Sequence, residues 1–262
     1  IMKLINNIKF TRLGILLLGL TITVTSCDEY LDVDTDKDNP TAAPLNLLLT
    51  GIQVDFNDIT DFDAYSGSVL AVYTHQMTVR EQPDQYGTRV DYANIQNEWN
   101  NIYITLTNVK SLIDQSTASG DKVYLGIGQL HKAYLYSVAV DLWGDVPFSE
   151  ANRLPEGIVS PKFDDQKEIY KEIFKLIDEA KANIASAEGA NKPSTDDLFY
   201  GGNTAKWIKF ANTFKLKLYN QTRLTADFDQ AGFDALVSEN KFFESASDDF
   251  EFKQYNILAP TD

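Results

Sequence analysis

The sequence predicts an all-α fold. Apolar residues recur at intervals of three and four along most of the chain, and no comparable series of alternating apolar and polar residues marks β-strands. Short polar or glycine-containing links separate the periodic segments, which is typical of antiparallel helical hairpins. The chain has 262 residues, so it is long enough to bury one large core.

The N-terminal segment indicates an export signal. Lys3, Lys9 and Arg12 precede a mostly apolar run at residues 13–24, and no acidic residue interrupts it. The run is shorter than the roughly 20 apolar residues that cross a bilayer, and it stops at Thr25 and Ser26. We therefore expect residues 1–26 to be a cleaved signal peptide.

The only cysteine of the chain, Cys27, follows this signal. The segment Val24-Thr25-Ser26-Cys27 resembles a relaxed lipobox, in which the thiol takes a diacylglycerol and the cysteine becomes the new N-terminus. The alternative is a stray cysteine beside an ordinary cleavage site, although a lone thiol is a liability in an exported protein. We predict lipidation at Cys27 and anchoring to a membrane, because each buried lipid methylene contributes about 0.8 kcal/mol.

Residues 27–41 are predicted to be an acidic, solvated tether. Alternating aspartates from Asp32 onward invite comparison with a calcium-binding loop. However, Lys37 occupies the sixth position, where that loop needs glycine, and Ala43 occupies the twelfth, where it needs glutamate. We therefore predict no metal site in the tether, and assign residues 42–262 to one helical domain.

Within this domain, helices are expected at residues 42–58 and 65–79, and then in a hairpin. The first helix of the hairpin begins at Asp91, a candidate N-cap, and its apolar stripe comprises Ile95, Trp99, Ile102, Leu106, Val109 and Ile113. Polar residues 116–120 are predicted to end it, and Asp121 is predicted to cap the second helix. The apolar stripe of that helix comprises Val123, Ile127, Leu130, Tyr134 and Val138.

The second helix is expected to stop at Trp143, because Gly144 can take the left-handed C-terminal position and Pro147 cannot continue a helix. A helix after Asp164 is predicted to end at Gly189 and to turn inward Ile169, Ile173, Leu176, Ala180 and Ile184. The next is predicted to open at Asn203 or Thr204 and to bury Trp207, Ala211, Phe214 and Leu218. A shorter helix from about Asp227 should use Phe233, Leu236 and Val237.

The charge of the chain excludes some partners. It carries 38 acidic and 23 basic residues, a net charge of −15, and removal of the signal makes this about −18. Such a field disfavours nucleic acid and anionic lipid surfaces, so we expect no nucleic-acid partner. With a single cysteine, stability must come from packing instead of an intrachain disulfide.

No catalytic or cofactor motif stands out. Of the two histidines, His75 and His131, the latter lies in a predicted helix beside its apolar stripe, which favours a structural role. Gly126 and Gly128 lack the third glycine of a dinucleotide loop. No histidines are paired at metal-binding spacing, so we predict no cofactor, no metal and no enzyme. A pair of distant carboxylates, as in glycosidases, stays open as an alternative.

Four segments in order give the chain a resemblance to the SusD/RagB-type nutrient-binding outer-membrane lipoproteins, specifically the SusD-like subgroup. They are residues 27–41; Trp99-Asn100-Asn101-Ile102-Tyr103; residues 128–136 leading to Leu142-Trp143-Gly144-Asp145-Val146-Pro147-Phe148; and residues 197–202 leading to residues 207–212. One departure is Lys132, where many relatives place arginine. The resemblance implies a helical body with tetratricopeptide-like hairpins.

The resemblance also implies a function. Such proteins sit on the outer face of the outer membrane over a SusC-like TonB-dependent transporter and help to capture oligosaccharides or sometimes peptides. Alternatives are a surface glycoside hydrolase and a purely structural surface lipoprotein. Members of this family typically run to about twice this length, and residues 250–262 hold apolar side chains without an evident way to bury them, so we expect a truncated chain.

The segment between Tyr73 and Tyr92 is the predicted ligand loop. Sugar-binding surfaces combine aromatic faces with amide and charged groups. The candidate binding residues in this loop are Tyr73, His75, Arg80, Gln82, Tyr86, Arg89 and Tyr92. The alternative is a loop that packs on the helical body. Trp99, Trp143 and Trp207 are assigned to core packing, because each has apolar neighbours at helical spacing.

Overall fold

The structure is a computed structural model that describes residues 43–60, 70–72, 74–76 and 96–252. Apart from residue 43, all of these belong to one unit, Pro44–Asp262. The predicted signal peptide, Cys27, the rest of the tether and the candidate cap Asp91 lie outside the described residues. Of the helix expected at residues 65–79, residues 70–72 are helical and residues 74–76 form a turn.

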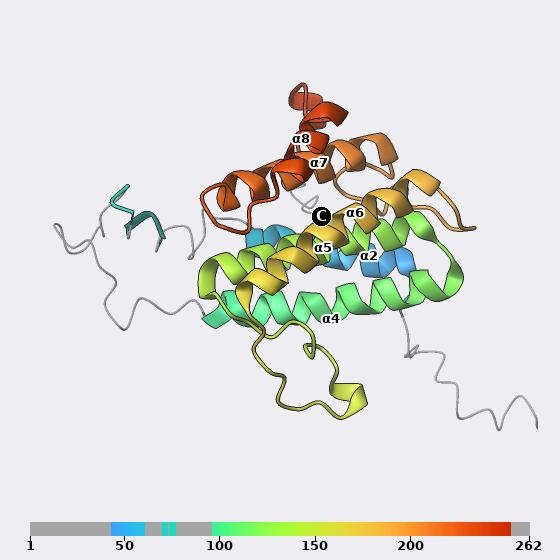
Figure 1. The fold of residues 1–262 in the computed structure, drawn as a ribbon. Helices are drawn as coiled ribbons and strands as arrows, with labels where there is room; N and C mark the ends of the chain where they lie inside the picture. Colours follow the sequence, from blue (N-terminus) through green and yellow to red (C-terminus); the bar gives the residue numbers. More distant parts are fainter. Residues whose placement is uncertain (1–42, 61–69, 73, 77–95, 253–262) are drawn as a thin grey trace, which may run out of the picture. The chain divides into compact units, whose positions relative to one another are not determined.

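The described residues form helices and loops, as predicted (Figure 1). The α-helices are α2 (Leu45–Thr60), α4 (Gln96–Ser119), α5 (Lys122–Trp143), α6 (Gln166–Ser186), α7 (Thr204–Thr222) and α8 (Gln230–Glu239). Two short 3₁₀ turns, η1 (Leu154–Glu156) and η2 (Ala246–Asp248), lie in the connections. Within the described part of the chain there is no β-strand, and one isolated bridge joins Val146 to Asp164. The all-α prediction is therefore confirmed.

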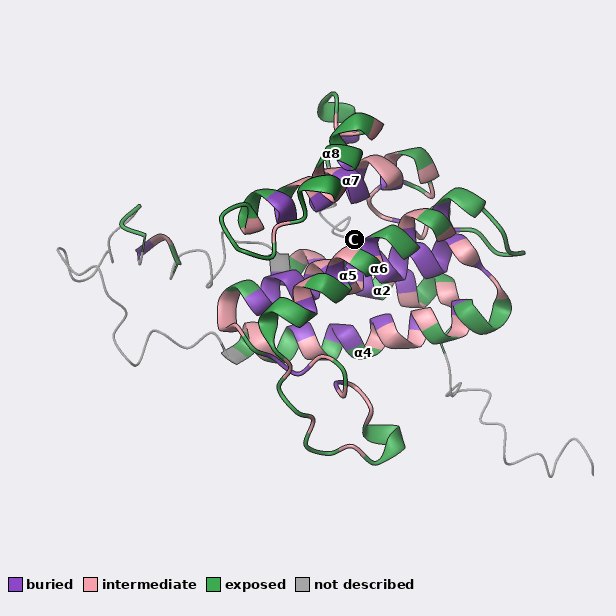
Figure 2. Ribbon diagram, viewed as in Figure 1, coloured by how far each residue is buried: buried purple, intermediate pink, exposed green. Residues whose placement is uncertain are grey.

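Helix α5 is the centre of the packing, with contacts to α4, α6, α2 and α7 (Figures 1 and 2). Its five predicted stripe residues are buried or partly buried, and so are most of its other side chains. A helix that is covered on several sides loses a polar face, which explains its weak amphipathicity. Gly126 permits the close approach of α6, because an added Cβ would lie 2.5 Å from Ile184 Cγ1 and 2.7 Å from the carbonyl oxygen of Ala180.

Helix α4 ends at Ser119, within the polar segment predicted to end it, and the buried Ser116 hydroxyl donates to the Leu112 carbonyl at 2.6 Å. The predicted cap of α5 was wrong in detail. Asp121 stands at the N-cap position of α5, but its side chain makes no capping hydrogen bond. Its carboxylate accepts instead from the backbone N–H and side-chain amide of Asn191, at 2.8 and 2.9 Å, and from Ser119.

The ends of α6 and α8 also differ from prediction. Helix α6 ends at Ser186 with Ala187 in the left-handed conformation, before Gly189 is reached. On α6, Ile177 is fully buried, and the predicted Leu176 is only partly buried. Helix α8 begins at Gln230, where the Asp229 carboxylate caps it.

The predictions for α8 and α7 concern which side chains are buried and, for α7, which residue caps the helix. On α8, Leu236 is buried as predicted, whereas Val237 is 45% exposed and was assigned wrongly. The prediction for α7 is confirmed, including its cap, because the Asn203 side chain accepts from the Lys206 N–H. Its four predicted core residues, Trp207, Ala211, Phe214 and Leu218, are all buried.

Hydrogen bonds join the two ends of the connection between α5 and α6. Gly144 ends α5 with φ +75°, a conformation that glycine adopts without strain. Asp145 then accepts from the Gln166 N–H at 2.9 Å, and Asp165 accepts from the next two N–H groups, so both carboxylates cap α6. Asp164 accepts from the N–H groups of Phe148 and Ser149 at 3.1 and 2.7 Å.

Asp197 joins α2 to α7. This carboxylate is 3% exposed, and accepts from Gln53 Nε2 at 2.9 Å, the Gly202 N–H at 2.8 Å and Trp207 Nε1 at 2.8 Å. The Gln53 Oε1 in turn accepts from the Leu198 N–H at 2.6 Å. The loop before α7 is thus fixed by buried polar contacts that span about half of the chain.

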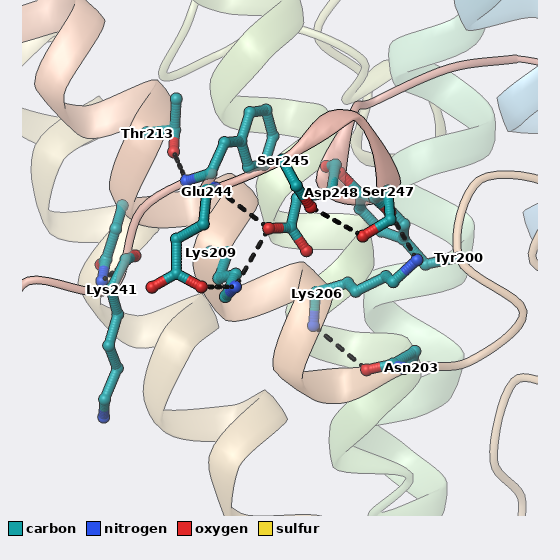
Figure 3. A network of polar contacts seen from close by, with 12 residues as sticks. Tyr200, Asn203, Lys206, Lys209, Thr213, Lys241, Glu244, Ser245, Ser247 and Asp248 are labelled. Atoms are coloured by element: carbon teal, nitrogen blue, oxygen red, sulfur yellow. Dashed lines mark hydrogen bonds and ion pairs between the residues drawn. The ribbon is translucent and has the colours of Figure 1, made fainter.

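The segment after α8 is tied back to α7 by the polar network in Figure 3. Lys209 Nζ lies 2.7 Å from Glu244 Oε2 and 3.0 Å from Asp248 Oδ2, and Asp248 also accepts from the Glu244 N–H. These contacts direct Phe250 onto the core, where its ring centroid lies 3.9 Å from that of Phe199. The expectation that Phe250 has nowhere to be buried was therefore wrong, and residues 253–262 lie outside the described residues.

Candidate functional site

Of the seven candidate residues in the predicted ligand loop, the structure describes His75. His75 lies in a turn, is exposed and has φ +59°. Tyr73, Arg80, Gln82, Tyr86, Arg89 and Tyr92 lie outside the described residues. The loop therefore stays a prediction.

The three tryptophans that we assigned to the core divide into two groups. Trp207 is fully buried, as predicted. Trp99, near the start of α4, and Trp143, at the end of α5, pack against the core as predicted, but both are only partly buried. Near a helix terminus there is no further turn of the helix to cover a side chain, so both indole rings are partly exposed.

Trp99 and Trp143 form, together with Phe163, what we call the aromatic patch. The two indole rings meet edge to face with centroids 5.1 Å apart. The Phe163 ring lies nearly parallel to that of Trp99, at an interplanar angle of 23° and a centroid distance of 6.3 Å. Phe163 is 64% exposed, so the patch has a ring that a ligand can reach.

The connection between α5 and α6 holds the aromatic patch in place. Tyr103, one turn after Trp99, donates from its hydroxyl to the Pro147 carbonyl at 2.8 Å. Burial, with a smaller effect from Asp164, raises the pKa of Tyr103 well above its usual value, so it remains a neutral donor. The Asn152 amide donates to the Tyr103 carbonyl at 2.8 Å, which docks the same connection on α4. The patch is therefore preorganised.

Chemically, the aromatic patch can stack on flat apolar surfaces. Pyranose rings expose C–H groups on one face, and aromatic side chains at partly open positions suit them. The patch offers no nucleophile or acid–base pair. Sequence reasoning missed Phe163, because it lies in an irregular segment where periodicity carries no information.

A groove is a second feature of this unit. It has a volume of about 1140 Å³ and is lined by α6, α7, α8, the end of α5 and the segment between α7 and α8. Three aromatic residues, Tyr170, Phe174 and Tyr219, lie along it, and the last two rings have centroids 4.6 Å apart. Ion pairs cross it: Lys215 to Asp178 at 2.6 Å and Lys181 to Glu239 at 2.7 Å.

His131 has a structural role, as predicted. It is 2% exposed, and its Nδ1 lies 2.8 Å from the Ile127 carbonyl oxygen. Burial lowers the pKa of His131 to about 4, against smaller opposing effects of that carbonyl and of Asp197. The ring is thus a neutral donor to the helix backbone, packed edge-on against Phe56 at 5.0 Å.

No cluster of three or more histidine, cysteine, aspartate or glutamate side chains among the described residues could hold a metal ion. Among the same residues, no helix combines the length and the apolar character needed to cross a bilayer.

The described residues thus form an all-α protein of helical hairpins that carries the aromatic patch on its surface. Comparison with protein families identifies it further. Residues 37–259 match the SusD-like family model described as "Starch-binding associating with outer membrane". Because this match covers most of the sequence, the chain belongs to the SusD-like family of nutrient-binding proteins.

Solved structures support this assignment. A SusD/RagB family protein from Bacteroides thetaiotaomicron superimposes with a TM-score of 0.66 at 25% identity, over 83% of this chain and 46% of its own. A SusD homologue from Bacteroides fragilis gives 0.59 at 25% identity, over 79% and 43%. A chitin-binding protein gives 0.62 at 27% identity, over 78% and 45%. The chain thus spans less than half the length of these three proteins; among curated proteins, none matches it.

Proposed function

We propose that this protein captures oligosaccharides at the bacterial outer membrane and delivers them to a SusC-like TonB-dependent transporter. The observation that carries this proposal is the family match at residues 37–259. One of the similar solved structures is a chitin-binding protein, which supports a glycan as ligand. Family members are binding proteins, so the glycoside hydrolase alternative loses support. Peptides stay a secondary candidate ligand.

The aromatic patch is the surface that we propose for sugar contact, together with the predicted loop at residues 73–92. Phe163 contributes an exposed ring, which contacts the ring of Trp99, and Trp99 in turn contacts Trp143. Stacking on such a ring contributes about 0.5 to 1.5 kcal/mol. Individual sugar contacts are therefore weak, and a chain of several sugar units is the expected ligand.

The test uses Phe163→Ala, with Leu154→Ala as its matched control. The two side chains lie in the same connection and are 64% and 66% exposed, so neither change should alter the fold. Calorimetric titration with neutral glucan and chitin oligosaccharides should show binding to the unaltered protein, weakened about two- to ten-fold by Phe163→Ala. Leu154→Ala should leave it unchanged. Equal affinities for the two variants would remove the aromatic patch from the proposal.

The predicted loop is tested in the same titrations. Tyr86→Ala and Arg80→Ala should each weaken binding several-fold without loss of helical content, because each removes about one stacking or hydrogen-bonding contact. Full-strength binding by both variants would move the ligand site away from residues 73–92. Binding of no oligosaccharide at all by the unaltered protein would refute the proposed function, and would favour a purely structural surface lipoprotein.

We further propose that residues 1–26 are removed, that Cys27 carries the lipid and that residues 27–41 tether the helical domain to the outer leaflet. The family description supports the outer membrane as the location. The proposal also accords with the net charge, because a processed protein at about −18 gains nothing from an anionic lipid surface and needs a covalent anchor.

A further inference from the structure

The groove between α6, α7 and α8 is a preformed surface that the aromatic patch does not include. Its volume of about 1140 Å³ exceeds the roughly 300 to 1,000 Å³ typical of small-molecule pockets, so it suits a ligand larger than one sugar. Three bridges fix the separation of its walls. Two are the lysine–carboxylate pairs described above, and the third is made by Asp141 of α5, which accepts from the Tyr170 hydroxyl of α6 and from Gln221 Nε2 of α7.

The lysines of this groove are already neutralised. Lys215 pairs with Asp178 and Lys181 with Glu239, both at hydrogen-bonding distance. Lys167 lies 3.8 Å from Asp227, and Lys171 Nζ lies 2.6 Å from the Glu168 carboxylate just outside the groove. Each of these amines therefore has an anionic partner, and none of them is left over for an anionic ligand.

Two carboxylates of the groove have only neutral partners. The Asp141 oxygens accept from the Tyr170 hydroxyl and the Gln221 amide, and Asp229 accepts from the Gly232 N–H at 3.0 Å. Within the described residues, neither forms an ion pair. The charge of Asp229 affects Tyr219, which lines the groove. Burial first and then Asp229 raise the pKa of Tyr219 to about 12. The groove thus presents two uncompensated negative charges.

A tyrosine lies beside each of these carboxylates. The partly exposed Tyr170 ring is joined to Asp141 by its own hydroxyl. At Gly232, which Asp229 caps, an added Cβ would lie 2.3 Å from the Tyr219 hydroxyl oxygen and 2.2 Å from Asp229 Oδ2, so this hydroxyl and the carboxylate converge there. The Tyr219 ring itself is 3% exposed and already has Lys215 Nζ 6.0 Å from its centroid. A protonated amine can therefore bind at Asp141 through a charge-assisted hydrogen bond and a cation–π contact with Tyr170, and at Asp229 through the carboxylate alone.

We propose that this groove is a separate binding site for amine-bearing oligosaccharides, such as oligomers of glucosamine. An extended or helical peptide fits less well, because strand addition needs a sheet edge and helix docking needs an apolar groove, whereas the described groove has charged walls and no strand. Carboxylates also accept hydrogen bonds from sugar hydroxyls. The choice of an oligosaccharide rests on the proposed function; the requirement for an amine rests on the groove alone.

The experiment titrates the full chain with three tetrasaccharides: a glucosamine tetramer, its N-acetylated counterpart and a neutral glucan. The glucosamine tetramer should bind the groove about ten-fold more tightly than the acetylated one, and its affinity should fall several-fold between roughly 50 and 300 mM salt. Asp141→Asn and Asp229→Asn should each weaken it about five-fold. Asparagine also caps helices, so Asp229→Asn should keep α8 intact.

Asp114→Asn is the matched control. It removes the same charge from an exposed site on α4, where Asp114 pairs with Lys110. An equal loss of affinity in this control would reduce the effect to the general negative field and overturn the proposal. So would equal affinity for the acetylated and deacetylated tetramers, or equally tight binding of a lysine peptide of the same charge.

The outcomes separate the two proposals of this article. If only the neutral glucan or the acetylated tetramer binds, and Phe163→Ala weakens that binding, the proposed function stands and the amine site is wrong. If only the glucosamine tetramer binds, and the Asp141 and Asp229 variants weaken it, the amine site stands. Capture of neutral oligosaccharides would then be refuted.

Discussion

Removal of the Asp197 carboxylate should be among the most destabilising single changes in the domain. The Asp197→Ala variant leaves two buried donors, Gln53 Nε2 and Trp207 Nε1, and the partly buried Gly202 N–H without the acceptor that now lies 2.8 to 2.9 Å away. Each orphaned donor costs about 1 to 3 kcal/mol, and entry of water or local relaxation recovers part of that cost. We expect a loss of about 3 to 5 kcal/mol in the free energy of unfolding.

Urea unfolding followed by circular dichroism measures this loss, and thermal unfolding should show a midpoint roughly 6 to 20 °C lower. The control is Asp114→Ala, which removes an exposed carboxylate and should change stability by less than about 0.5 kcal/mol. A double-mutant cycle with Trp207→Phe isolates the indole contact, and its coupling should be about 1 kcal/mol or more. A loss below about 1 kcal/mol in Asp197→Ala would refute the view that this carboxylate joins α2 to α7.

Three further predictions concern other parts of the chain. Because His131 has its pKa lowered to about 4, the folded protein binds fewer protons than the unfolded chain between pH 6.5 and 4. Stability should therefore fall by about 1.4 kcal/mol per pH unit as the pH drops through this window, and urea unfolding of His131→Gln should show a correspondingly shallower decline. Gly202→Ala should lower the unfolding midpoint strongly, since φ is +77° and the new Cβ would lie 2.0 Å from the Pro193 carbonyl oxygen; an unchanged midpoint would contradict this. Cys27→Ser should move the exported protein out of the detergent phase, and unchanged partitioning without attached lipid on the natural protein would refute the anchor.

The sequence was most informative where long helices bury one continuous stripe. The stripe of α7 was identified residue by residue, because steps of three and four place side chains on one face. On α4, Ile102, Leu106 and Val109 are buried as predicted. The fully buried Leu112 was missed there, and Ile113 is only partly buried. Helix α5 was found as well, but its stripe gave no sign that α4 and α6 both cover it. Periodicity indicates which side of a helix is apolar, but it does not indicate how many other helices pack against that helix.

Errors arose where a distant partner replaced a local one. Asp121 follows the local rule for a cap, yet its carboxylate binds Asn191, 70 residues away. Trp99 and Trp143 have helical spacing, but at helix ends that spacing does not ensure a cover. Neither the exposure of Phe163 nor the groove has any local signature, because four helices from different parts of the sequence build the groove. Long-range contacts of this kind emerge only in the folded chain.

The closed base of the α5–α6 connection has a consequence for how the protein tolerates change. The Val146–Asp164 bridge and the Asp164 carboxylate pin the two ends of the connection together, while its tip carries exposed Leu154 and Val159, 66% and 78% accessible. Lengthening a loop whose ends are already fixed adds only about 0.6 kcal/mol of chain entropy for each doubling. The tip around η1 is therefore a natural insertion point, where an epitope or a fluorescent reporter can be added without disturbing the helices.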